Sequence, residues 1–305
     1  MKMFFYQTFF GLVLALIGAG AQAKLTIVTT TEDIGSIARS LGGAHVEVTS
    51  LTRGTQDAHF VEAKPSMIRQ LARADLFMVV GADLEIGWLQ PLLETARNAR
   101  VQPGTHGYLD LSTTVDLLEK STGPVSRAQG DVHAAGNPHY WLDPRNGFRL
   151  ARAIATRLTE LDPGHAQMFR ANLAAFERRL GERMTQWQVQ LAPLKGKPVI
   201  AYHKSFLYLA HAFGFQIVEE IEPKPGIPPN AAHLQQLIQQ IGTQKIGLLI
   251  MEPYYERRSA DYLRDRTGIR IAIVPNSTGG VPGADDYFGL FDVIVRALAD
   301  RGAPS

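Results

Sequence analysis

One apolar stripe near the middle of the chain most constrains its fold. Between Pro163 and Pro193, large apolar residues recur at steps of three or four, at Phe169, Leu173, Phe176, Leu180, Met184, Trp187 and Leu191. This spacing predicts one amphipathic α-helix, although an ordinary packed surface helix would show the same stripe. Asp162 can cap it and Pro163 can start it, so a helix from Pro163 to Leu191 would span about 43 Å. A helix of that length crosses a whole domain, so we expect it to join two lobes.

On both sides of this helix, strand-like apolar runs alternate with helical patterns. Strands are predicted at 25–30, 46–51, 76–80, 199–202, 216–221, 246–251 and 269–274, and helices at 33–41, 65–73, 85–97, 146–161, 205–213, 231–241, 257–267 and 286–299. Such alternation is typical of parallel sheets covered by helices. We therefore expect an α/β fold with two lobes of mostly parallel sheets, joined by one long α-helix. The N-terminal lobe is predicted at 24–161, the linking helix at 162–193 and the C-terminal lobe at 194–305.

The first 23 residues read as a signal peptide. Lys2 gives a positive start, residues 9–20 form a short apolar core, and Ala21-Gln22-Ala23 matches a cleavage site. The apolar run is too short for a stable membrane span, so an uncleaved anchor is the weaker alternative. The chain has no cysteine, hence no disulfide and no site for lipid attachment. We expect a free periplasmic protein that begins at Lys24.

The composition argues against several classes of protein. Charged residues make up 20% of the chain and hydrophobic residues 45%, as in soluble globular proteins. The formal net charge is +2, with Lys and Arg scattered among nearly equal numbers of Asp and Glu. We therefore expect no nucleic-acid partner, and we expect a monomer. Because cysteine is absent, any bound metal must be held through nitrogen and oxygen.

Three histidines lie at comparable junctions between predicted strands and helices. His59 follows the strand 46–51 by a loop, His203 ends the strand 199–202, and His139 lies in the Asn137–Pro144 segment, just before a helix start. In an open parallel sheet, ligands bind beyond the carboxyl ends of the strands. Each histidine alone would more often be structural. Their shared position predicts one metal site in the cleft between the lobes.

Three neutral imidazoles suit zinc, and also copper, nickel or cobalt, better than calcium or magnesium. The fourth position is open: Asn276, just after the strand 269–274, offers an amide oxygen, and Asp57, Glu252 or water are alternatives. Asp57 is also a possible acceptor for an imidazole N–H, and this is the preferred role for Glu252. Asp131 and His133 form a weaker candidate for an accessory site.

The same residues carry a family resemblance. The chain resembles the solute-binding receptors of zinc and manganese ABC importers over essentially its whole mature length. The motifs that carry the resemblance are His59 with Lys64-Pro65-Ser66 and Ala74-Asp75-Leu76, the Pro138-His139-Tyr140-Trp141-Leu142-Asp143-Pro144 block, Tyr202-His203 and Glu252-Pro253. The resemblance implies two α/β lobes joined by a rigid helix.

It also implies that His59, His139 and His203 bind a divalent metal, which the protein delivers to a membrane permease. Histidine at the third place is more typical of zinc receptors than of manganese receptors. The chain departs from the family pattern twice. Asn276 stands where many members have aspartate, and the His-rich loop of many zinc receptors is reduced to little more than Asp131 and His133.

Two alternatives to a zinc receptor remain at this stage. The first is the same receptor with manganese or iron as its cargo, because most nitrogen-rich sites rank the divalent metals in a similar order of affinity. A zinc hydrolase is the other, because three histidines with an open fourth position also describe catalytic zinc. However, the chain has no His-Glu-x-x-His, no Gly-x-Ser-x-Gly and no phosphate-binding loop, and Glu252 is the one obvious base. We therefore expect a receptor without catalytic activity.

Overall fold

The strands form two separate four-stranded sheets, and every strand pair within them is parallel. The computed structural model describes residues 24–120, 133–224 and 226–300, so the predicted signal peptide and Asp131 lie outside the described residues. The first sheet has the order β2-β1-β3-β4, with β1 Leu25–Thr29, β2 Val46–Ser50, β3 Leu76–Val79 and β4 Tyr108–Asp110. The second has the order β6-β5-β7-β8, with β5 Pro198–Ala201, β6 Gln216–Glu220, β7 Leu248–Met251 and β8 Arg270–Ile273.

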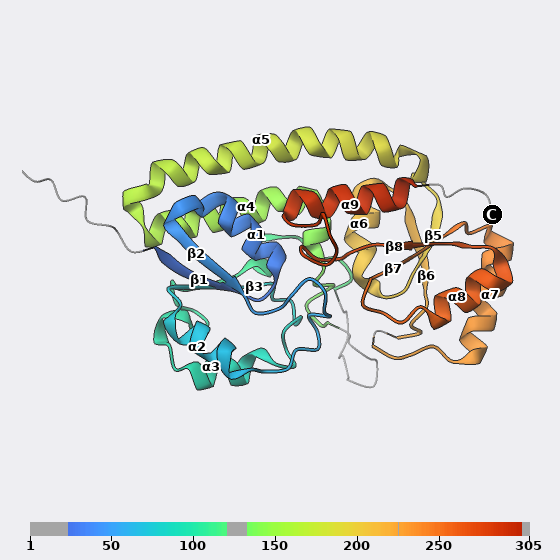
Figure 1. Ribbon diagram of the computed structural model, residues 1–305, viewed down its shortest axis with the longest axis horizontal. Coiled ribbons are helices and arrows are strands. Elements are labelled where there is room, and N and C mark those ends of the chain that lie inside the picture. The colour runs from blue at the N-terminus through green and yellow to red at the C-terminus, as the bar shows by residue number, and fades with distance from the viewer. Residues whose placement is uncertain (1–23, 121–132, 225, 301–305) are drawn as a thin grey trace, which may run out of the picture.

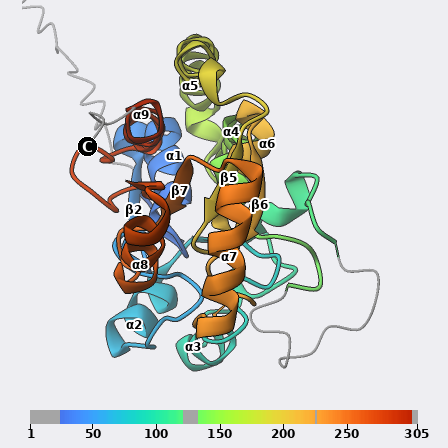
Figure 2. The same ribbon diagram turned by 90° about the vertical axis from the view of Figure 1, so that its right-hand side faces the viewer.

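Helices cover the sheets, and one long helix extends over both (Figure 1). The described helices are α1 Glu32–Gly42, α2 Pro65–Arg73, α3 Leu89–Ala96, α4 Pro144–Leu161, α5 Ala166–Leu191, α6 Leu207–Phe213, α7 Ala231–Gln244, α8 Arg258–Thr267 and α9 Tyr287–Ala299. Helices α1 and α4 lie between α5 and the first sheet, while α2 and α3 lie on the other side of that sheet. Figure 2 shows α7 and α8 side by side at the end of the second lobe. The prediction of an α/β fold with two parallel-sheet lobes and a long linking helix is therefore confirmed.

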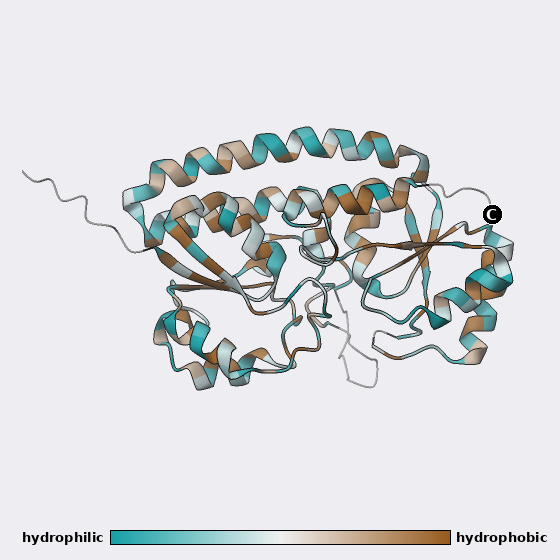
Figure 3. Cartoon of the chain, viewed as in Figure 1, coloured by the Kyte–Doolittle hydropathy of each residue, from teal (hydrophilic) through white to brown (hydrophobic). Residues whose placement is uncertain are grey.

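The long helix α5 buries the predicted stripe. Of the seven apolar residues, five are buried and two half-buried. The side of α5 that faces solvent is largely hydrophilic (Figure 3). The helix begins three residues later than predicted, because Pro163–His165 forms a 3₁₀ turn in which the Asp162 carboxylate hydrogen bonds the His165 ring at 2.6 Å. At 26 residues, α5 spans about 39 Å at 1.5 Å per residue, which is enough to pass over both sheets.

Helix α9 packs on α5 and also contacts α1, so the last described helix meets the first. Trp187 of α5 stacks on Phe291 of α9 with 4.9 Å between ring centroids. At the start of α9, the Tyr287 N–H donates to Ser36 Oγ and its hydroxyl donates to the Trp141 carbonyl, at 2.9 and 2.8 Å. One continuous hydrophobic core therefore runs under α5 from the first sheet to the second.

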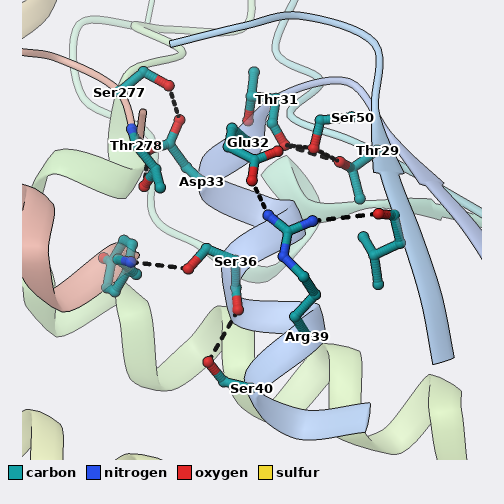
Figure 4. A network of polar contacts seen from close by, with 12 residues as sticks. Thr29, Thr31, Glu32, Asp33, Ser36, Arg39, Ser40, Ser50, Ser277 and Thr278 are labelled. Carbon is teal, nitrogen blue, oxygen red and sulfur yellow. Dashed lines mark hydrogen bonds and ion pairs between the residues drawn. The ribbon is translucent and has the colours of Figure 1, made fainter. Parts of the chain in front are cut away.

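A buried carboxylate joins α1 to the segment after β8 (Figure 4). Asp33 accepts hydrogen bonds from Ser277 Oγ at 2.6 Å and from the Thr278 N–H and Oγ1 at 2.8 and 3.0 Å. Burial raises the pKa of Asp33 to about 6, and the three donors oppose that shift. These bonds link residues about 245 positions apart, next to the loops that carry the candidate site.

Two details of the first lobe differ from prediction. The edge strand β4 was not predicted, because three residues are too few to show an alternating pattern. Helix α3 begins at Leu89 rather than at residue 85, because the Glu85 side chain hydrogen bonds the turn before the helix. Its buried carboxylate accepts from the N–H groups of Val80 and Gly81 and from Thr30 Oγ1. In the described part of the chain, no helix is both long enough and apolar enough to cross a membrane.

Candidate metal centre

The structure brings together the three histidines that the sequence singled out. His59 comes from the loop after β2, His139 from the segment before α4, and His203 from the end of β5. One ring nitrogen from each of them lies within 4.8 Å of the other two. Ring centroids are 5.1 Å apart for His59 and His139, 5.4 Å for His59 and His203, and 5.6 Å for His139 and His203. Their side chains are almost entirely shielded from solvent.

His59 and His139 are held by the same local device. In each case the side-chain oxygen of the residue two positions earlier accepts from both the backbone N–H and ring Nδ1 of the histidine. Asp57 Oδ1 lies 2.9 and 2.7 Å from these two nitrogens of His59. Asn137 Oδ1 lies 3.0 Å from both in His139. Such short-range turns are common for Asp and Asn, and here each one also fixes a ring.

His203 has no such residue before it and is held from the neighbouring strand instead. Its Nδ1 lies 2.7 Å from Oε2 of Glu222, just beyond β6, and the same oxygen accepts from the Gly226 N–H at 2.9 Å. All three Nδ1 atoms thus face a side-chain oxygen acceptor and carry the ring proton. In the neutral rings the Nε2 atoms are then left as metal-binding lone pairs.

The electrostatics of the site favour a neutral imidazole at His139 and an ionised carboxylate at Asp57. Burial, with further contributions from the neighbouring imidazoles, lowers the pKa of His139 well below its ordinary value. For Asp57, burial raises the pKa, but its hydrogen bonds and attraction to His59 outweigh burial, so the net pKa is lowered. The result is an ionised carboxylate at Asp57 and a neutral ring at His139, and metal binding requires unprotonated ring nitrogens.

Asn276 and Asp57, which the sequence analysis considered as a fourth ligand, both lie near the histidines but differ in their hydrogen bonds. Asn276 lines the same small cleft as His59 and His139, its side-chain amide donates to the Tyr254 hydroxyl at 2.8 Å, and its carbonyl accepts from Trp141. Asp57 is engaged by His59, and its second oxygen lies 3.4 Å from the Tyr255 hydroxyl.

Glu252 does not hold an imidazole, so the preferred role predicted for it is wrong. It is fully buried, and neither of its carboxylate oxygens has a hydrogen-bond partner among the described residues. Burial raises its pKa to about 8. The acceptor role is taken by Glu222 because β6 lies beside β5 with Glu220 opposite Ala201, so that Glu222, two residues later, comes level with His203.

His133 also lies at this site. Its Nε2 is 3.2 Å from Nε2 of His59, and the two ring centroids are 5.2 Å apart. Burial, followed by the neighbouring imidazoles, lowers the pKa of His133 to about 3. The sequence analysis placed it only in a weaker candidate accessory site with Asp131, because nothing in the sequence shows that His133 lies beside His59.

Two supporting residues, Asn137 and Glu222, were missed. For Asn137 a signal was present, since Asp57-x-His59 and Asn137-x-His139 share one spacing. For Glu222 there was none, because its contact with His203 depends on the pairing of β5 with β6.

The comparisons with known proteins agree with this fold and site. A family model described as "Zinc-uptake complex component A periplasmic" matches residues 27–301. The high-affinity zinc uptake system protein ZnuA of Yersinia pestis is 26% identical over 282 residues, covering 87% of each chain. The manganese-binding lipoprotein MntA of Halalkalibacterium halodurans is 27% identical over 246 residues, covering 75% of this chain and 76% of its own.

Solved structures show the same fold. A crystal structure of ZnuA matches with a TM-score of 0.76 at 23% identity, covering 92% of this chain and 100% of its own. A Mn-bound periplasmic metal-binding protein from Candidatus Liberibacter asiaticus, as its S38A mutant, matches with a TM-score of 0.75 at 19% identity, covering 91% and 99%. The chain therefore belongs to the family of periplasmic A components of zinc-uptake complexes, in the solute-binding branch of zinc and manganese ABC importers.

Proposed function

We propose that the mature protein is a periplasmic receptor that captures one Zn²⁺ with His59, His139 and His203 and delivers it to the membrane permease of an ABC importer. The observation that carries this proposal is the convergence of three imidazoles whose Nδ1 atoms each face an oxygen acceptor. Rings fixed in this way are typical of zinc ligands, and loss of such acceptors weakens metal sites.

Zinc is favoured over manganese by the donor atoms. Manganese prefers carboxylate, carbonyl and water oxygens, whereas imidazole nitrogens suit zinc. At this site the nearby carboxylates of Asp57 and Glu222 are engaged with ring N–H groups. Manganese remains the second candidate, because a manganese-binding relative matches three quarters of the chain.

A receptor role without catalysis is favoured over hydrolysis by the position of Glu252. This residue was the one obvious base, yet its side chain is fully buried and does not line the cleft beside His59 and His139. A general base must reach the water that it activates. We therefore propose that the bound metal is cargo and not a catalyst.

The test is elemental analysis of the mature protein purified from its native periplasm without added metal or chelator. We expect about one zinc per chain, lost in His139→Ala and retained in His106→Ala, whose exposed side chain lies in another part of the first lobe. Manganese or iron in place of zinc would overturn the identity of the cargo but not the location of the site. No metal in the wild-type protein would overturn the function.

A further inference from the structure

We propose that His133 is the fourth ligand of the metal, so that the bound ion is held by four imidazoles. This inference rests on the proposed function and deepens it, because it assigns the coordination position that the three lobe histidines leave open. His133 lies in the connection between β4 and α4, the same connection that supplies His139.

The first argument is distance. Two nitrogens bound to one tetrahedral zinc at 2.0–2.1 Å are separated by about 3.3 Å. The Nε2 atoms of His59 and His133 are 3.2 Å apart. The His133 ring centroid, at 5.2 Å, is as close to His59 as those of His139 and His203, at 5.1 and 5.4 Å. His133 is therefore at the spacing of a ligand from His59, but it lies outside the group of three whose ring nitrogens are all within 4.8 Å of one another, so it must move toward His139 and His203 to join them on one ion.

The second argument is the arrangement of ring protons. His59 donates its Nδ1–H to Asp57, so its neutral ring has a lone pair at Nε2. The His133 ring also hydrogen bonds the backbone of Asp83, and because this bond raises the pKa of His133, the Asp83 carbonyl accepts from a ring N–H. When the His133 proton lies on its other ring nitrogen, the lone pairs of the two Nε2 atoms face each other at 3.2 Å and repel, unless a cation lies between the nitrogens and binds both. A metal ion would satisfy both nitrogens.

The third argument is that the backbone around Asp83, which hydrogen bonds the His133 ring, is itself held in place. The Gly81-Ala82-Asp83 run has three consecutive positive φ angles, +74°, +49° and +65°, which are costly for Ala82 and Asp83. Buried Glu85 holds this run by accepting from the Val80 and Gly81 N–H groups at 2.8 and 3.0 Å. Backbone strain of this kind is concentrated at functional sites.

A turn on the other side of His133 gives it a second support. The His133 carbonyl accepts from the Gly136 N–H at 3.2 Å, and the next residue, Asn137, is the one that holds the His139 ring. His133 and His139 are thereby carried by one short connected segment. A metal bound by both would tie this segment to His59 in the first lobe and to His203 in the second.

X-ray absorption spectroscopy at the zinc edge tests the proposal, because it counts imidazole ligands. The mature protein, His133→Ala and the control His106→Ala are each loaded with one equivalent of zinc. We expect four imidazoles in the wild type and in His106→Ala, and three in His133→Ala. Three imidazoles in the wild type, or an unchanged count in His133→Ala, would overturn the role of His133 and leave the three-histidine receptor intact. A wild-type protein that binds no zinc would overturn both.

A competition titration with a zinc chelator gives a second readout. We expect His133→Ala to bind zinc more weakly by at least the roughly tenfold loss typical of disturbed metal sites, while the stoichiometry stays at one per chain. His133→Gln, which keeps a polar side chain on the turn, serves if the alanine variant does not fold. Wild-type affinity in a folded variant would overturn the proposal.

Discussion

The ring Nδ1 of His203 lies 2.7 Å from Oε2 of Glu222, and this contact crosses from β5 to the end of β6. It is the counterpart of the contact that Asp57 makes with His59 within a single turn. An acceptor at Nδ1 fixes both the ring orientation and the tautomer, and thus directs the Nε2 lone pair toward the metal.

We predict that Glu222→Ala weakens zinc binding about ten- to a hundredfold, since this is the usual cost of removing such an acceptor. Asp57→Ala should have an effect of the same size. A suitable control is Glu219→Ala on the same strand, because Glu219 bonds Gln240 and not a histidine. Isothermal titration with a competing chelator measures the difference. Equal affinities for Glu222→Ala and Glu219→Ala would show that the contact does not support the site.

Gly54 provides a test of the junction between the lobes. A Cβ at this position would lie 2.0 Å from the Thr278 carbonyl oxygen and 2.5 Å from the Gly280 nitrogen, both backbone atoms of the segment after β8. Gly54→Ala must therefore push the two loops apart. We predict a loss of about 1–3 kcal/mol in the free energy of unfolding, typical of overpacking, together with weaker zinc binding.

The matched control is Gly242→Ala in α7, where an added Cβ would meet no atom within 4 Å. This change should stabilise the protein by up to about 1 kcal/mol, because alanine favours a helix interior over glycine. Urea unfolding of the metal-free proteins measures both effects. If Gly54→Ala proved as stable as the wild type, the loops would not be in the tight contact that the structure shows.

Much of the fold could be predicted because its signals are local. The α5 stripe, the Asp143 cap before Pro144 and the strand-helix alternation each depend on residues close in sequence. The convergence of His59, His139 and His203 was predicted from the rule that ligands bind beyond the carboxyl ends of parallel strands, and in the structure the site joins such ends from both sheets to the segment before α4. What could not be predicted depends on tertiary contacts.

Three such contacts decided the details of the site and its surroundings. Glu222 was missed because its role requires β6 to pair with β5. The position of His133 was not predicted, because its contact with His59 joins residues 74 positions apart in the sequence. The late start of α3 follows from Glu85, which is typical of helices but here accepts a hydrogen bond from Thr30, 55 positions earlier, as well as from the turn before α3. In each case a contact across the fold outweighed the local pattern.

Buried carboxyl groups give the stability a predictable pH dependence. Burial raises the pKa of Glu252 to about 8 from an ordinary value of 4.5. Between these values the folded protein keeps a proton that the unfolded chain has lost, so this group's contribution to stability falls as the pH rises from about 4.5 to 8. The pKa values of Glu85, about 7, and of Asp33, about 6, are raised by burial in the same direction.

We predict that Glu252→Gln, which is neutral at every pH, loses less stability between pH 5 and pH 8 than the wild type. The control is Glu256→Gln, since Glu256 is exposed on the surface four residues later. Urea unfolding of the metal-free proteins at both pH values gives the comparison. An equal loss in Glu252→Gln and the wild type would mean that Glu252 is ionised in the folded protein at neutral pH.

The last prediction concerns motion on metal binding. Helix α5 packs against α1, α4 and α9, and the Asp33 carboxylate binds the segment after β8, so the lobes share one core and one polar junction. A large hinge closure would have to break both. We therefore expect solution scattering profiles of the metal-free and zinc-loaded protein to superimpose. Hydrogen exchange should slow only in the loops that carry His59, His139 and His203. A clear decrease in radius of gyration on zinc addition, absent in His139→Ala, would contradict the rigid junction and show that the lobes close on the metal.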